Sequence, residues 1–134
     1  ALLLLMYKSS SEALTMQKHT VEHILPQKPK RKDWAGNFPN LFDEKEKIRD
    51  DAKQKSTYSV GNLMLLEDKQ NKSLGNLSFD KKVKKMRSMD IKDVIHTENK
   101  HNIYNIEDFN QNAINSRLKE IKKVLNDCFN GLTI

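Results

Sequence analysis

The sequence predicts an α+β fold: two short strands and a helix, with further helices at both ends. Two observations predict it. Residues 20–25 and 58–66 are short apolar runs of the length typical of strands. Over 79–86 and 109–129, apolar residues instead recur at intervals of three and four, as in amphipathic helices. A chain of 134 residues is long enough for one domain with a modest core.

The composition favours a small hydrophobic core, a highly charged, solvated surface and a polyanionic partner. Hydrophobic residues make up 37% and charged residues 31% of the chain, and 24 basic against 18 acidic residues leave a net charge of +6. Such an excess attracts nucleic acid, although solvated helix faces can carry it equally well. Cys128 is the only cysteine, which excludes an internal disulfide and a cysteine-rich zinc site and favours the cytoplasm.

The first seven residues are strongly apolar, yet far short of the roughly 20 that a membrane span needs. They lack the basic start and the cleavage site of a signal peptide. Because the chain opens inside an apolar element without an initiator Met, we expect a C-terminal fragment of a longer protein. Residues 1–19 would be the end of an upstream helix and a connection, and residues 20–134 one domain.

The first half of the chain is predicted to be a strand, a loop and a surface helix. The strand over 20–25 ends at Pro26, which cannot donate to a ladder. Residues 27–41 contain two prolines and a glycine without a regular period, so we expect a loop that carries a basic cluster and Trp34. Residues 43–55 are good helix formers with few apolar anchors, which predicts a surface helix.

The second half is predicted to be a strand followed by helices. Gly61 and Asn62 mark a bend at the start of the second strand, and a helix begins within 67–72. Ser78 is a good N-cap for the next helix, whose lysines are expected on its solvent faces. Residues 90–105 are irregular, with a short helix near 91–95. In the last helix, Arg117 and its neighbouring lysines are expected to lie away from the apolar stripe.

Four polar residues could carry chemistry together. Glu22 and His23 stand at the end of the first strand, and Asn71 follows the second. Carboxylate and amide oxygens suit Mg²⁺ or Mn²⁺, and a neutral imidazole is the usual general base. Neighbours in a strand face opposite sides, so Glu22 and His23 can share a site only where the strand bends or ends. Asn62 would fasten the loop after the first strand through side-chain hydrogen bonds.

Taken singly, each of these residues has an ordinary alternative. The histidine could be structural, the carboxylate exposed, Asn62 a turn residue and Asn71 a surface amide. Their joint order is more specific: EHILPQ (22–27), Trp34, GNLMLL (61–66), Asn71, LGNLSF (74–79) and Lys82. This order resembles the HNH (His-Me finger) nucleases, most closely the C-terminal nuclease domain of GmrSD-type restriction proteins.

The resemblance implies a ββα-metal core with flanking helices. In it His23 is the general base, Glu22 and Asn71 are metal ligands, and Asn62 is the structural middle residue of the motif. It further implies a Mg²⁺- or Mn²⁺-dependent DNA endonuclease of a bacterial restriction or anti-phage system, in the cytoplasm. An N-terminal NTP-hydrolysing or modification-sensing domain would precede it.

Basic residues are the predicted contacts to nucleic acid. Lys82 is expected to touch a phosphate, and Lys81, Lys85 and Arg31 to add salt-sensitive attraction. Two alternatives stay open: a DNA-binding module without turnover, and an RNase toxin that uses the same site. These residues do not distinguish DNA from RNA.

Overall fold

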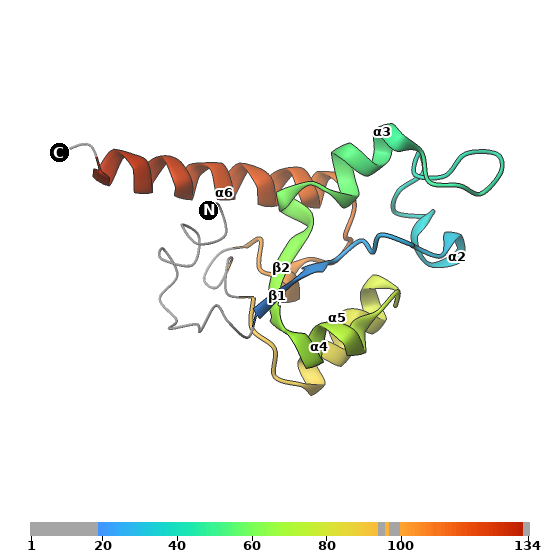
Figure 1. Cartoon of the computed structure of the whole chain (residues 1–134), viewed down its shortest axis with the longest axis horizontal. Coiled ribbons are helices and arrows are strands. Elements are labelled where there is room, and N and C mark those ends of the chain that lie inside the picture. Colours follow the sequence, from blue (N-terminus) through green and yellow to red (C-terminus); the bar gives the residue numbers. More distant parts are fainter. Residues whose placement is uncertain (1–18, 94–95, 97–99, 133–134) are drawn as a thin grey trace.

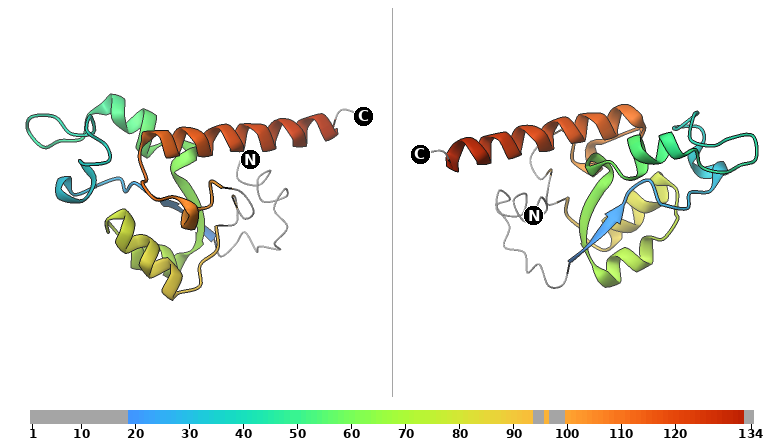
Figure 2. Two further views of the ribbon diagram at one scale, coloured as in Figure 1. Left: turned by 180° about the vertical axis from the view of Figure 1, so that it is seen from behind. Right: turned by 45° about the horizontal axis from the view of Figure 1, so that its top comes forward.

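In the computed structural model, which describes residues 19–93, 96 and 100–132, a small sheet lies between two helical parts. The antiparallel strands are β1 (His19–His23) and β2 (Leu63–Glu67). The long helix α6 (Gln111–Leu132) lies on one side of them, and α4 (Asp68–Leu74) and α5 (Phe79–Ser88) lie on the other (Figures 1 and 2). The predicted α+β class is confirmed, whereas the expected upstream helix falls outside the described residues.

The strand register leaves one edge of β1 open to side chains. His19 pairs with Glu67 and His23 with Leu63, and the N–H of Ile24 continues the ladder to the carbonyl of Asn62 at 2.9 Å. Successive backbone groups in a strand point in opposite directions. The carbonyls of Val21 and His23 therefore face away from β2, toward α4 and α5.

The helix α4 begins directly after β2, whereas residues 24–62, with several short helical segments, separate β2 from its partner β1 along the chain. Glu67 caps α4: its N–H donates to Oε1 of Gln70 at 3.2 Å, and its side chain accepts from the first turn in return. Because the strand runs into the helix without a loop, residues of α4 have a fixed position beside β1.

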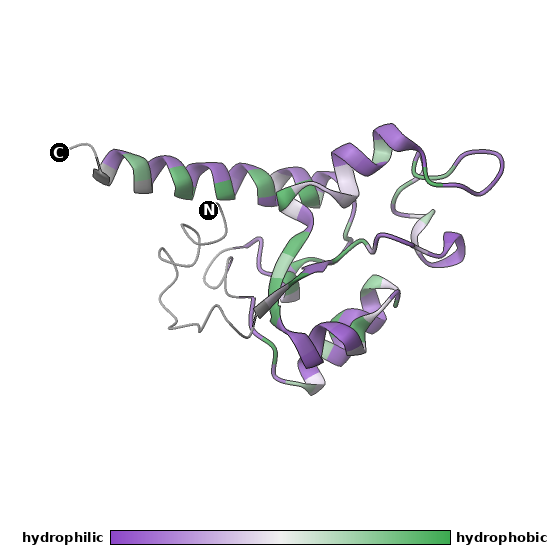
Figure 3. Ribbon diagram, viewed as in Figure 1, coloured by the Kyte–Doolittle hydropathy of each residue, from purple (hydrophilic) through white to green (hydrophobic). Residues whose placement is uncertain are grey.

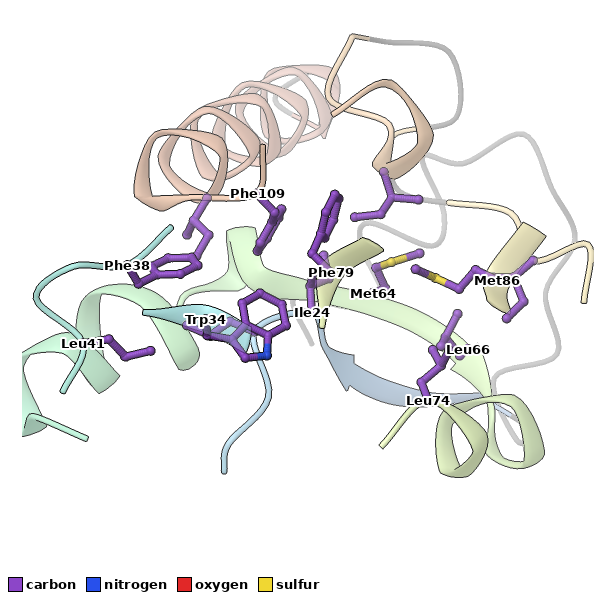
Figure 4. Close-up of a cluster of buried hydrophobic side chains, with 14 residues drawn as sticks. Ile24, Trp34, Phe38, Leu41, Met64, Leu66, Leu74, Phe79, Met86 and Phe109 are labelled. Atoms are coloured by element: carbon purple, nitrogen blue, oxygen red, sulfur yellow. The ribbon is translucent and has the colours of Figure 1, made fainter. Parts of the chain in front are cut away.

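One apolar cluster holds these elements together (Figure 4). Trp34 is fully buried, and the rings of Phe79 and Phe109 stack at 5.2 Å. Met64 and Leu66 from β2 and Leu74 from α4 join the same cluster. The sheet is thus built on a packed scaffold. No helix in the described part of the chain is long and apolar enough to cross a membrane.

The surface helix predicted over 43–55 is largely wrong. Residues 43–49 form a turn in which Oδ1 of Asp43 accepts from the N–H groups of Lys45 and Lys47, at 2.8 and 2.9 Å. An aspartate that binds nearby backbone N–H groups competes with a helix for them. The helix α3 (Asp50–Ala52) is short, and it continues as a π-helix, η2 (Lys53–Thr57).

Two further predicted boundaries shift. The second strand starts later than expected because a 3₁₀ turn, η3 (Val60–Asn62), precedes it. One helical turn, α2 (Arg31–Trp34), lies inside the predicted loop. Residues 91–93 are not helical, the rest of the short helix expected there falls mainly outside the described residues, and η4 (Ile103–Asn105) follows.

Arg117 corrects the predicted face of the last helix. The helical pattern places it in solvent, but it is fully buried, and its guanidinium donates to the carbonyl of Gly61 at 2.9 Å and to Asp93 at 2.9 Å. At the other end of α6, apolar residues continue (Figure 3), yet Phe129 is 53% exposed. Only the first half of the apolar stripe therefore packs on the core among the described residues.

Gly61 lets the helix approach η3 closely. A Cβ atom at this position would lie 2.1 Å from the carbonyl oxygen of Ile114, in the backbone of α6. Real Cβ atoms do not come so close, so only glycine fits. The glycine expected to mark a bend is also a contact point between η3 and α6.

Candidate active site

The side chain of Asn62 fastens the end of β1. It is completely buried, and its Oδ1 accepts from the N–H of Leu25 at 2.7 Å. Its Nδ2 donates to the carbonyls of Leu25 and Thr57, at 2.9 and 3.0 Å. These are side-chain to backbone bonds of the kind expected of Asn62. These bonds fix the segment that follows His23. A role of Asn62 in catalysis stays a prediction.

His23 is the last residue of β1 and is partly exposed. Its ring meets the ring of Tyr58 edge-on, with centroids 6.4 Å apart, and its Nε2 lies 3.4 Å from Nε2 of Gln27. Burial, with a smaller effect from the charge of Lys82, lowers the pKa of His23 below its usual 6.5. The imidazole is therefore neutral at neutral pH, as a proton acceptor must be.

Glu22 and Lys82 form a buried ion pair along the free edge of β1. The Nζ of Lys82 lies 2.5 Å from Oε1 of Glu22 and also donates to the carbonyl of His23 at 2.9 Å. Lys82 is fully buried and Glu22 is 6% exposed. The expectation that Lys82 lies on a solvent face is thus wrong, because its ammonium is engaged by the buried carboxylate. Its contact with a phosphate stays a prediction.

Burial opposes the charged forms of this pair. It raises the pKa of Glu22, against the lowering effect of Lys82, and it lowers the pKa of Lys82, against the raising effect of Glu22. In both residues the desolvation is the larger effect. Both residues are consequently closer to their neutral forms than the members of an exposed ion pair would be.

Asn71 stands on α4 against the same edge of β1. Its Nδ2 donates to Oγ1 of Thr20 at 2.8 Å and to the carbonyl of Val21 at 3.0 Å. Nδ2 makes both hydrogen bonds of this side chain to described residues, so Oδ1 is left without a partner among them. The structure therefore brings Glu22, His23 and Asn71 to the end and free edge of one strand.

By chemical type, the oxygens of Asn71 and Glu22 suit a divalent ion that keeps most of its water. The amide oxygen of Asn71 and the second carboxylate oxygen of Glu22 are hard donors, and Mg²⁺ commonly takes one or two carboxylates besides water and substrate. In the described residues, no three acidic, histidine or cysteine side chains gather into a site. Lys82 is a rival cation for Glu22.

The motifs around this strand agree with a known family. The sequence matches the family model described as GmrSD restriction endonucleases, C-terminal domain, over residues 2–124. The chain belongs to this family. The resemblance of the motifs is thereby confirmed, and membership implies a nuclease. No curated protein and no solved structure matches the chain.

The other cations predicted for this GmrSD C-terminal domain occupy varied positions. Lys81 is exposed on α5, while Nζ of Lys85 donates to the carbonyl of Ser73 at 2.6 Å. Arg31 is exposed on α2, 3.9 Å from Glu46. Their contact with nucleic acid stays a prediction.

Tyr58 is a neighbour of His23 that the sequence did not single out. It is 50% exposed. The local pattern predicts it as the first residue of a strand, since a tyrosine beside an apolar run is typical of strands. Its position next to the imidazole depends on contacts between distant segments, which no local pattern reports.

Proposed function

We propose that this domain is a metal-dependent endonuclease of the HNH type that cleaves or nicks DNA. One observation carries the proposal: a partly exposed, neutral His23 stands at the end of a strand that the buried amide of Asn62 fastens in place. The antiparallel pairing of β1 with β2, the helix α4 that follows β2, and membership of a restriction-endonuclease family support it.

In this proposal the residues of the chain have separate tasks. His23 accepts the proton of the attacking water at an imidazole nitrogen, and Asn62 keeps the segment after it from shifting. Glu22 and Asn71 would hold Mg²⁺ or Mn²⁺ through their oxygens. The ion, when bound, supplies positive charge to the phosphate and to the leaving oxygen.

The partner proposed is DNA, in keeping with the net charge of +6 and the family. An N-terminal NTP-hydrolysing or modification-sensing domain of the same bacterial, cytoplasmic protein is the further partner proposed. Cleavage of RNA by the same residues and DNA binding without turnover are the competing outcomes of the test below.

The test uses supercoiled plasmid and a labelled RNA, each with Mg²⁺, Mn²⁺ or EDTA. We expect metal-dependent cleavage of the plasmid and about a 10²- to 10⁴-fold loss of rate in His23→Ala, the usual effect of removing a general base. Glu22→Ala and Asn71→Ala should instead weaken Mn²⁺ binding in calorimetry. His101→Ala, a histidine outside β1, is the matched control. Wild-type cleavage by His23→Ala would exclude the proposed base.

A further inference from the structure

A groove opens beside two residues that contact His23. It has a volume of about 640 Å³, and Tyr58 and Gln27 line it. Both residues also touch His23: the Tyr58 ring meets the imidazole edge-on, and Nε2 of Gln27 is 3.4 Å from Nε2 of His23. His23 itself is not a lining residue, so the groove lies next to the proposed general base through these two neighbours.

The charge of the groove is positive. Four cationic and two acidic side chains line it: Lys28, Lys47, Arg49, Lys53, Asp43 and Asp50. Arg49 is paired with Asp51 at 3.2 Å, and the carboxylate of Asp43 accepts from backbone N–H groups. Within the described chain, Lys28, Lys47 and Lys53 have no ion pair. Three lysines are thus available to an anionic ligand.

Tyr58 offers this ligand an aromatic surface in a fixed place. It follows the π-helix η2, a distortion that is frequent at functional sites. The preceding residue, Thr57, is buried, and its carbonyl accepts from Nδ2 of Asn62, the amide that also binds Leu25. One buried amide therefore sets both the strand that ends in His23 and the residue before Tyr58.

We infer that this groove holds a single strand of nucleic acid, with an unpaired base stacked on Tyr58 and its phosphates near Lys28, Lys47 and Lys53. A half-exposed aromatic ring in a positive groove is the combination that binds single strands, because every base has a face to stack and every nucleotide a phosphate. The inference rests on the proposed function, since it places the strand next to His23.

Binding in EDTA tests the stacking contact without cleavage. Labelled single-stranded DNA, single-stranded RNA and the matching DNA duplex are titrated with the chain by fluorescence anisotropy. Tyr58→Ala should weaken single-strand binding roughly 5- to 100-fold, and Tyr58→Phe should restore it. Phe129→Ala is the matched control, because Phe129 is the other large apolar side chain that is about equally exposed among the described residues. The DNA and RNA arms decide which strand fits better.

The lysines are tested by salt. Replacing Lys28, Lys47 and Lys53 by Gln should reduce the log–log salt slope on a single strand by about 0.7 for each phosphate that a lysine neutralises. The same change at Lys119, Lys122 and Lys123, exposed on α6, should leave it unchanged. Equal effects of the two triple variants would overturn the inference that a single strand binds in this groove. Wild-type binding by Tyr58→Ala would overturn it as well.

The results separate the two proposals. If plasmid cleavage needs His23 but Tyr58→Ala binds single strands like the wild type, only the proposal of strand binding in the groove is rejected. Binding that needs Tyr58, without cleavage in any metal, would reject the nuclease alone. A chain that binds no nucleic acid would reject both.

Discussion

Two buried ion pairs in this domain look alike and differ in their surroundings. Glu22 and Lys82 meet at 2.5 Å on the free edge of β1, and Asp93 and Arg117 meet at 2.9 Å between α6 and the segment before η4. Both cations are fully buried. Arg117 also donates to three backbone carbonyls, whereas Lys82 donates to one.

The different surroundings indicate different roles for the two pairs, one structural and one at the candidate active site. The planar guanidinium has five donors and spreads its charge over fixed acceptors, and Asp93 in turn accepts from the N–H of Ile103 at 2.9 Å. Lys82 is a point charge, and burial shifts the pKa of both members of its pair toward the neutral forms. Such perturbed groups cluster at functional sites. The arginine pair holds the fold, and the lysine pair lies at the candidate active site.

The largest effect on stability is expected at Arg117. Arg117→Met removes the cation that pairs with Asp93 and the donor to three carbonyls, and loss of one member of a buried pair costs about 3–5 kcal/mol. Urea unfolding followed by circular dichroism measures it. Lys119→Met, exposed on the same helix, is the control. A loss no greater than that of the control would remove the distinction between the two pairs.

The next largest effect is expected at Gly61, which lies where η3 contacts α6 and whose carbonyl accepts from Arg117. Gly61→Ala places a Cβ 2.1 Å from the carbonyl oxygen of Ile114, so η3 and α6 must separate. Overpacking of this kind costs about 1–3 kcal/mol. Gly36→Ala is the matched control, because nothing lies within 4 Å of a Cβ at Gly36. Equal thermal midpoints for the two variants would contradict the close approach.

Lys82→Met should cost less than Arg117→Met, because Glu22 can take up a proton when its partner is gone. We expect about 1–3 kcal/mol at pH 7, measured in EDTA. A carboxyl whose pKa is raised by folding stabilises the fold below its unfolded value, near 4.5, and loses that contribution as the pH rises through the folded value. The deficit of the variant should therefore shrink toward acid pH. A deficit that does not change with pH would show that removing Lys82 leaves the pKa of Glu22 unchanged.

The smallest effect is expected at an exposed pair. Arg31 and Glu46 are 3.9 Å apart in solvent, and such pairs contribute about 0–1 kcal/mol. Arg31→Ala should leave the urea midpoint almost unchanged, so any loss of DNA binding in this variant reports contact rather than folding. A large loss of stability would mean that the contribution of an ion pair in this domain does not depend on its burial.

The sequence by itself determined the features that depend on neighbours along the chain. The apolar run before Pro26 becomes β1, although this strand ends at His23, two residues earlier than predicted, and the run that follows Gly61 and Asn62 becomes β2. The period of α5 located its buried residues Phe79 and Met86. Local sterics and hydrophobic periodicity decide such features, so they can be predicted without a partner.

Only the tertiary structure decided where the charged residues lie. A helical period places Lys82 and Arg117 on a face, and a charged side chain is expected in solvent unless a partner is known. Glu22 is 60 residues from Lys82, and Asp93 is 24 from Arg117, so the partners become visible only when the fold brings them together. Tyr58 reaches His23 through the hydrogen bonds of Asn62. Burial of a charge is a property of pairs, and a local pattern describes one residue at a time.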